Sequence, residues 1–316
     1  MLVECRCLQM ERGDISVVVP VFGHFTRWRL LDTVLNAWAI QTVRPTVWLA
    51  YQGPETHEGL LEKGCGAAHH IVHLPSTASP PSPGCVRNGA LARVRAAHCY
   101  VTDADVLPRR DDYLARCLEF SNRCGAAALT KPGMVRVRAS EASFSTWYDE
   151  NKHVQSVEKS GQCIQVLREG RLHPSAAGEV FETIDGDVYC CTKTEKELLN
   201  KYAGREDDLE ELIMKPTVHW GGLFARMDAI RIVGGYGEVY VEWGCEDDDL
   251  HYKLASTVSL NRLHLPDEPQ PLLHLEHPRT RNTESYRQNL RRFSDRKQMD
   301  FNSLLASDRL AFARHA

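Results

Sequence analysis

The chain has 316 residues, of which 38 are Lys or Arg and 42 are Asp or Glu, giving a formal charge of −4. This length can bury a substantial core as one large domain or two modest ones. The slight acidic excess argues against a nucleic-acid binder, because such proteins usually carry a basic surplus. The longest apolar stretch, residues 15–22, is too short to span a bilayer, and the N-terminus lacks the apolar core of a signal peptide. We therefore expect a cytoplasmic protein, which also fits eleven cysteines with no CxxC pair.

The first half of the sequence alternates strand and helix patterns. Residues 15–21 are a β-branched run typical of a buried parallel strand, and residues 27–41 carry apolar side chains on one helical face. Further strands are predicted over 46–51, 71–74 and 99–102, with a helix over 86–97. A proline-rich segment, 75–84, is predicted to be neither helix nor strand. This alternation predicts a mostly parallel sheet with a ligand site beyond the carboxyl ends of its strands.

The second half begins less clearly. Residues 132–215 mix two short strand-like pieces with a polar helix over 194–202, and we interpret them as an inserted subdomain of uncertain role. The strand-like pieces are 163–167 and 187–191. After this segment the patterns predict a strand over 220–225, a helix over 246–254 and a polar helix over 284–305. The predicted fold class is α/β, a central sheet flanked by helices, divided into 1–131, 132–215 and 216–316.

Two aspartates follow the predicted strand 99–102. Asp103 and Asp105 are two positions apart, so both carboxylates leave the strand end on the same side. Their hard oxygens suit Mg²⁺ or Mn²⁺, and either ion bridges the oxygens of a diphosphate. A polar cap on a strand end would use the same residues, so the pair alone does not establish a metal site.

Four consecutive acids, Glu246 to Asp249, open the predicted helix 246–254. The first turn of a helix favours carboxylates, because its N–H groups are unpaired and its dipole is positive there. Four acids repel one another more than capping requires, so one of them is a candidate general base. Helical positions lie about 100° apart, so we expect Asp249 to point away from the side of Asp247, toward the helix cap or solvent.

Two histidines lie close together after the second proline-rich stretch. His274 and His277 are at i and i+3, and from a turn both imidazoles would reach one metal ion. Imidazole together with carboxylate favours Mn²⁺ over Mg²⁺. A purely structural histidine pair is the alternative.

Together these motifs resemble those of the GT-A-fold glycosyltransferases, which use nucleotide sugars. The resemblance is to the carboxyl half of the β-1,4-galactosyltransferases and polypeptide N-acetylgalactosaminyltransferases, in which a Gly-Gly strand precedes a WGxEDDD motif and a later histidine. Here Gly221-Gly222, Gly234-Gly235-Tyr236 and Trp243–Asp249 follow that order. The resemblance covers about 14–131 and 216–292 and implies a Rossmann-like GT-A fold. Its nucleotide-sugar half would be 1–131, and its catalytic, metal-binding half 216–316.

The resemblance also implies roles for individual residues. Asp247 would be the catalytic base, and Glu246 the catalytic carboxylate that binds the acceptor. The side chains expected to hold Mn²⁺ or Mg²⁺ are Asp103, Asp105, His274 and His277, with His274 in place of the family's methionine. The residues expected to contact the nucleotide sugar are Pro20, Val21, Phe22, Tyr51, Gln52, Arg87, Asn88, Asp103, Trp220, Gly222 and Trp243.

The second predicted strand departs from the family pattern. It ends in Ala50-Tyr51-Gln52-Gly53, without the aspartate that commonly binds uracil in family-2 enzymes. We therefore expect a GDP-sugar, or another donor whose base is not uracil, with Tyr51 stacking on the base. The middle segment does not identify the acceptor hydroxyl, and neither a nucleic-acid partner nor a membrane span is expected.

Three functions are compatible with these motifs. The first is metal-dependent transfer of a sugar to an acceptor hydroxyl, inverting the anomeric centre. The second is a metal-dependent pyranose/furanose mutase or isomerase that rearranges the nucleotide sugar itself, because one scaffold can host several reactions. The third is a nucleotide-sugar-binding protein without catalysis.

Overall fold

The computed structural model describes residues 14–22, 28–53, 67, 70–74, 82–138, 165–168, 171–174, 179–182, 188–191, 212–242, 244–268, 270–275 and 283–316. The strands of its main sheet are β1 (Ile15–Phe22), β2 (Thr46–Gln52), β3 (His70–His73), β4 (His98–Val101), β6 (Ala128–Thr130), β13 (Leu223–Arg226) and β14 (Leu260–Arg262). The helices are α1 (Trp28–Ala39), α3 (Pro83–Leu91), α4 (Tyr113–Cys124), α7 (Met227–Val233), α8 (Glu246–Thr257), α9 (Thr283–Gln298) and α10 (Phe301–Ala313). Among the described residues, none of these helices is both long and apolar enough to cross a membrane.

The main sheet has seven strands in the order β14-β6-β13-β4-β1-β2-β3. All neighbouring pairs are parallel except those made by β13, which runs antiparallel to both β4 and β6. In the centre, Val18 of β1 lies opposite Trp48 on one side and Val101 on the other. The mostly parallel α/β sheet expected from the sequence is therefore confirmed.

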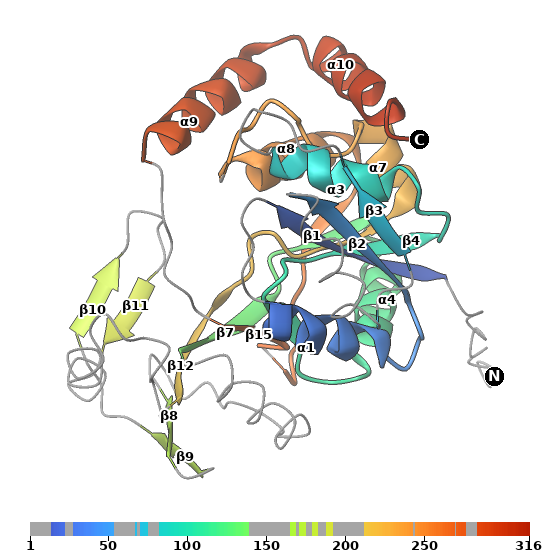
Figure 1. Cartoon of the computed structure of the whole chain (residues 1–316). Coiled ribbons are helices and arrows are strands. Elements are labelled where there is room, and N and C mark those ends of the chain that lie inside the picture. The colour runs from blue at the N-terminus through green and yellow to red at the C-terminus, as the bar shows by residue number, and fades with distance from the viewer. Residues whose placement is uncertain are drawn as a thin grey trace, which may run out of the picture.

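Helices cover both faces of this sheet (Figure 1). α1 and α4 lie on one face, where Trp38 packs against Tyr100 and Tyr113 and its indole N–H donates to Val106 O at 3.0 Å. α3, α7, α8 and α10 lie on the other face, over a second apolar cluster that includes Val86. The two clusters account for the unbroken apolar run in β1, because its side chains alternate between two buried layers.

A second sheet links the middle of the chain to its C-terminal half. Its strands are β5 (Val106–Pro108), β15 (Leu272–Leu275), β7 (Gly133–Arg138), β12 (Leu212–Val218), β8 (Gln165–Arg168) and β9 (Arg171–Pro174), in that order. β10 (Glu179–Glu182) and β11 (Val188–Cys191) form a separate antiparallel pair. β12 crosses the predicted boundary at 215, and β7 lies against β15. The division of the chain at 131 and 215 stays a prediction.

The structure corrects three predicted elements. α3 begins at Pro83 rather than 86, because the Ser82 hydroxyl accepts a hydrogen bond from Cys85 N and proline suits the first helical position. The single helix predicted over 284–305 is two helices, α9 and α10, and the Asp300 side chain caps the second by accepting from Ser303 N at 2.8 Å. The strand predicted over 220–225 starts only at Leu223, because Gly222 N bonds to His219 O in a turn. The helix predicted over 194–202 lies outside the described residues.

Candidate active site

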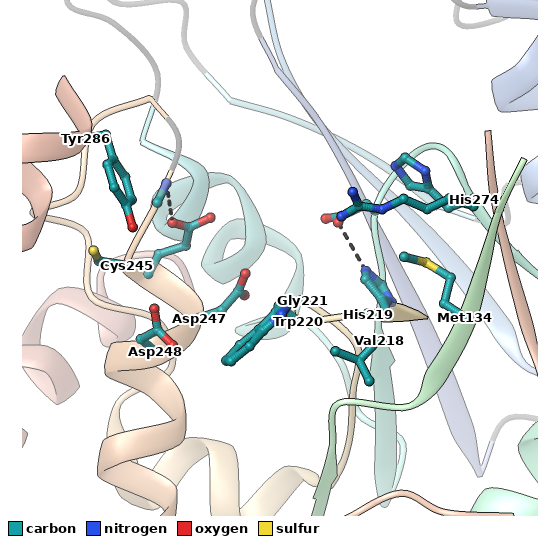
Figure 2. A pocket seen from close by; sticks show the side chains of 14 residues that line it. Met134, Val218, His219, Trp220, Gly221, Cys245, Asp247, Asp248, His274 and Tyr286 are labelled. Atoms are coloured by element: carbon teal, nitrogen blue, oxygen red, sulfur yellow. Dashed lines mark hydrogen bonds and ion pairs between the residues drawn. The ribbon is translucent and has the colours of Figure 1, made fainter. Parts of the chain in front are cut away.

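A cavity of about 210 Å³ lies between the start of α8 and strands β7, β12 and β15 of the second sheet. Its lining includes carboxylates, two histidines and two aromatic rings: Asp103, Met134, Arg136, Val218, His219, Trp220, Gly221, Gly244, Cys245, Glu246, Asp247, Asp248, His274 and Tyr286. Figure 2 shows Asp247 and Asp248 on the α8 side, facing His219 and His274 across the cavity. Asp103 lies just beyond the carboxyl end of β4, which is where open α/β sheets bind their ligands.

Asp103 is held in place by two basic side chains. Its Oδ1 accepts a hydrogen bond from Arg87 at 2.9 Å, and its Oδ2 lies 3.1 Å from His219 Nε2. Burial alone would raise the pKa of Asp103, but His219 and Arg87 together lower it to about 2. Asp103 therefore presents a fixed negative charge to the cavity at neutral pH.

Arg87 connects the two acidic motifs from behind the cavity wall. The residue is 3% exposed, and its guanidinium donates to Asp103 and, at 3.2 Å, to Glu246 Oε1. It also lies over the Tyr236 ring, 5.1 Å from the centroid. Burial acts to lower the pKa of Arg87, yet Asp247 and the other nearby acids raise it well above its ordinary value. The guanidinium thus stays charged and fixes Asp103 relative to α8.

Glu246 anchors the first turn of α8. Its Oε1 accepts from Arg87, and its Oε2 accepts from Gly244 N at 2.9 Å. Gly244 has φ +112°, which glycine accommodates without strain. Cys245 follows with φ +71°, a left-handed conformation that is uncommon for a residue with a side chain. Both oxygens of Glu246 are engaged, so this residue positions the helix start and Arg87.

Asp247 faces the cavity and differs from its neighbours in its hydrogen bonding. Its Oδ1 is buried and has no hydrogen-bond partner among the described residues. Burial raises the pKa of Asp247 well above its ordinary value, and the charges of Glu246 and Asp103 raise it further against the opposing effect of Arg87. A buried carboxylate with a raised pKa is the group expected to accept a proton from a bound substrate.

Gly221 keeps the space between the two motifs open. A Cβ at this position would lie 3.3 Å from Asp103 Oδ2, 3.3 Å from Asp247 Oδ2 and 3.4 Å from His219 Nε2. These three groups therefore approach one point in the cavity, although they come from β4, α8 and the loop after β12. A side chain at position 221 would therefore push these groups apart by a few tenths of an ångström.

Asp249 points away from the cavity, as the helical spacing predicts. The expectation that it would reach the helix cap or solvent is wrong, because its side chain is fully buried. Its two oxygens accept from Arg296 at 2.8 and 3.0 Å, and Arg296 also donates to Asp308 at 2.6 Å. Lys253 completes this cluster, donating to Asp308 at 2.5 Å. Asp249 thus joins α8 to α9 and α10.

The predicted metal ligands are brought together in part. Asp105 Oδ2 and His274 Nε2 lie 3.4 Å apart, although about 170 residues separate them in the chain. His274 is in strand β15, not in the predicted turn, and it lies opposite Val106 of β5, next to Asp105. His277 lies outside the described residues. Within the described part of the chain, none of Asp103, Asp105 and His274 belongs to a group of three potential ligand atoms that all lie within 4.8 Å of one another.

The predicted nucleotide contacts on β1 and β2 do not line this cavity. Pro20 and Val21 are buried within β1, and Phe22 is partly buried. Tyr51 is 2% exposed and Gln52 is 8% exposed, so neither presents an open face for stacking here. The role of these residues toward a nucleotide stays a prediction.

Three further predicted contacts have clear structural positions. Asn88 is fully buried and holds the 236–238 loop, bonding to Tyr236 O and to Glu238. A Cβ at Gly222 would meet His219 and Pro132 at 2.7 and 2.8 Å, so the turn requires glycine. Trp220 lines the cavity and is 42% exposed, with the Lys131 amine 3.7 Å from the centroid of its ring system. Trp243 lies outside the described residues.

Three polar residues of the cavity lining are not among the residues predicted from the sequence. His219 directly precedes the Trp220-Gly221-Gly222 motif, so its position beside that motif was an available signal. Arg136 comes from β7 and Tyr286 from α9, and both line the cavity. No local pattern marks them, because their place depends on the pairing of β7 with β15 and on the course of α9.

Solved structures of S. aureus TarS are similar to this chain. The structure of residues 1–349 in complex with UDP is 13% identical, with a TM-score of 0.48, and the match covers 93% of this chain and 70% of that one. The complex with UDP-GlcNAc gives 12% identity, a TM-score of 0.48, and coverage of 95% and 73%. No protein-family model matches the sequence, and no curated protein matches it.

Proposed function

We propose that this protein is a metal-dependent glycosyltransferase that uses a nucleotide-sugar donor and inverts the anomeric centre. The observation that carries the proposal is the convergence of Asp103 and Asp247 on the space beside Gly221, at the carboxyl end of a parallel sheet. Asp103 is a stable anion there, whereas the pKa of Asp247 is raised well above its ordinary value, first by burial. One carboxylate thus suits charge binding, and the other suits proton transfer.

The donor set around Asp105 fits Mn²⁺. The 3.4 Å between Asp105 Oδ2 and His274 Nε2 is a separation that two ligands of one ion adopt at bond lengths of about 2.1 Å. Asp105 and His274 would hold the ion. Asp103 would have to move closer to this pair to become a third ligand, and His277 is proposed as a further ligand. When bound, the ion offsets the charge of the leaving diphosphate, which contributes several kcal/mol to transition-state stabilisation.

The remaining steps belong to the protein's own side chains. Asp247 accepts the proton of the acceptor hydroxyl as that oxygen attacks the anomeric carbon from the side opposite the diphosphate. Arg87 and Glu246 keep Asp103 and the start of α8 at a fixed separation. The acidic lining disfavours binding of the anionic donor without a cation, so we expect the reaction to require metal.

The test is donor turnover by the purified protein with a panel of hydroxyl acceptors, in which UDP-, GDP-, dTDP- and ADP-sugars are each supplied with Mn²⁺ or with EDTA. Release of nucleoside diphosphate with Mn²⁺ and none with EDTA supports the proposal. A GDP-sugar, or another donor whose base is not uracil, is expected to react fastest. If an isomeric nucleotide sugar forms without any acceptor, the protein is a mutase rather than a transferase. If none of the donors is converted, the proposal that the protein is an enzyme is wrong.

The residue assignment is tested in the same assay. Asp247→Asn keeps the shape of the side chain and removes the base, so we expect a loss of at least about 10²-fold in kcat. Asp248→Asn is the matched control, since Asp248 lies near Lys131 and Lys297, and we expect it to lose less than about tenfold. If Asp248→Asn is inactive while Asp247→Asn keeps near-full rate, the base must be reassigned.

A further inference from the structure

A second group of potential metal ligands lies outside the candidate active site. Cys85, Glu238 and His315 each offer one ligand atom, and the three atoms lie within 4.8 Å of one another. They come from the first turn of α3, the loop between α7 and α8, and the residues after α10. Among the described residues, this is the one group of three His, Cys, Asp or Glu side chains that meets this distance.

We propose that Cys85, Glu238 and His315 form a zinc site. A thiolate, an imidazole and a carboxylate are the three ligand types that Zn²⁺ takes in proteins, at bond lengths of about 2.0–2.3 Å. The soft sulfur selects against Mg²⁺ and Mn²⁺, which prefer oxygen. All three residues are partly exposed, so an ion has a path to the site, and water completes a tetrahedral shell.

The metal-free hydrogen bonding already orients these ligands. His315 Nε2 lies 2.7 Å from Glu238 Oε1, and that same oxygen accepts from Asn88 Nδ2 at 2.8 Å. Asn88 also fixes the backbone of Tyr236, so Glu238 is held by a neighbour that does not bind the ion. Support of this kind from a second layer of residues is usual for metal ligands.

Binding requires a small opening of this arrangement and the release of protons. Two tetrahedral ligands at about 2.0 Å from one ion lie about 3.3 Å apart, so the 2.7 Å contact between His315 and Glu238 must lengthen. Cys85 loses its thiol proton, and the proton between His315 and Glu238 is displaced by the ion. The negative charge of the thiolate and carboxylate then balances the dication.

The site would fasten the parts of the chain that position the catalytic carboxylates. Cys85 is two residues from Arg87, and Glu238 precedes Glu246 by eight residues, so the ion would tie together both sides of the Arg87–Glu246 bond. His315 adds the end of α10, which lies on the same face of the main sheet as α3 and α7 (Figure 1). We therefore expect a bound ion to stabilise this part of the fold. With three protein ligands and a water its shell stays open to exchange, and the ion is separate from the Mn²⁺ of the proposed reaction.

The experiment is a titration of chelator-treated full-length protein with Co²⁺, a spectroscopic substitute for Zn²⁺, in excess Mg²⁺ to fill sites made of oxygen. A sulfur-to-cobalt charge-transfer band is expected in the wild type and in Cys124→Ser, which alters an exposed cysteine elsewhere. The band should disappear in Cys85→Ser. His315→Gln should weaken Co²⁺ binding at least about tenfold. A loss of about tenfold is the smallest that mutation of a residue supporting a metal ligand usually causes, and loss of a ligand should cost at least as much.

A second readout guards against misfolding of the variants. Zn²⁺ should raise the melting temperature of the wild type but not of Cys85→Ser, while both melt at a similar temperature in EDTA. A band that persists in Cys85→Ser, or no band in folded wild type, would overturn the zinc site. Neither result depends on donor turnover, so the proposed reaction stands or fails separately.

Discussion

Two groups of charged side chains lie on opposite sides of α8. In one group the charges balance, and in the other the acidic side chains outnumber the basic ones. On one side, Asp249 and Asp308 face Lys253 and Arg296 in a buried cluster, two anions against two cations, joined by bonds of 2.5–3.0 Å. On the other side, the cavity is lined by Asp103, Glu246, Asp247 and Asp248, with Arg136 in the lining and Arg87 behind it. The first group is complete within the protein, whereas the second carries surplus negative charge.

The difference is sharpest between Asp247 and Asp249, which are two residues apart. Two helical positions differ by about 200°, so these side chains leave α8 on nearly opposite sides. Both oxygens of Asp249 are hydrogen-bonded to Arg296, while Oδ1 of Asp247 has no such partner within the described part of the chain. Two acids of one motif thus differ in their partners: Asp249 joins three helices of the fold, whereas Asp247 keeps a buried oxygen available for the proton transfer that we propose.

The largest expected effect comes from breaking the complete group. Asp249→Ala leaves Arg296 buried beside an empty position, and removing one partner of a buried ion pair costs about 3–5 kcal/mol. Unfolding in urea should therefore show a fall of that size in the free energy of unfolding. In the part of the chain that the structure describes, Asp247 has no equivalent ion-pair partner, so Asp247→Asn should lower the free energy of unfolding much less. An equal loss in the two variants would contradict the distinction between Asp247 and Asp249.

A smaller effect is expected from filling the space that the cavity keeps open. Gly221→Ala would place a methyl group 3.3 Å from the carboxylates of Asp103 and Asp247, in the space that we propose for the ion and the diphosphate. Misplacement of reacting groups on this scale lowers rates by up to about 10²-fold, so we expect donor turnover to fall by about tenfold. The free energy of unfolding should change by less than about 1 kcal/mol. Unchanged turnover would show that this space is not part of the site.

The sequence predicts the main sheet well and the site only in part. β-branched runs such as residues 15–21 identify buried strands, because both faces of a parallel sheet are covered. Asp103, Asp105 and the acids of α8 are visible as local motifs next to predicted elements. β15 is missed because a four-residue apolar segment becomes a strand only through pairing with β5 and β7, which are distant in sequence.

The same limit applies to the partners of individual side chains. The burial of Asp249 depends on Arg296 and Asp308, which lie on helices that the sequence suggests are one. Arg136 reaches the cavity through the pairing of β7 with β12 and β15, both of which are distant in the sequence. Local sequence patterns predict which residues are acidic and which are helical. They do not predict which charged side chains pair, because those contacts join segments that are distant in the sequence.

The most direct test of the surplus charge is whether Mn²⁺ and a nucleoside diphosphate bind cooperatively. Calorimetric titration of the wild type should show that Mn²⁺ raises nucleotide affinity at least about tenfold, and linkage requires the nucleotide to raise Mn²⁺ affinity by the same factor. Asp105→Asn should abolish this coupling, while Asp249→Asn, where it folds, should keep it. Equal nucleotide affinity with and without Mn²⁺ in the wild type would contradict the account, because the cavity would then need no cation to bind its donor.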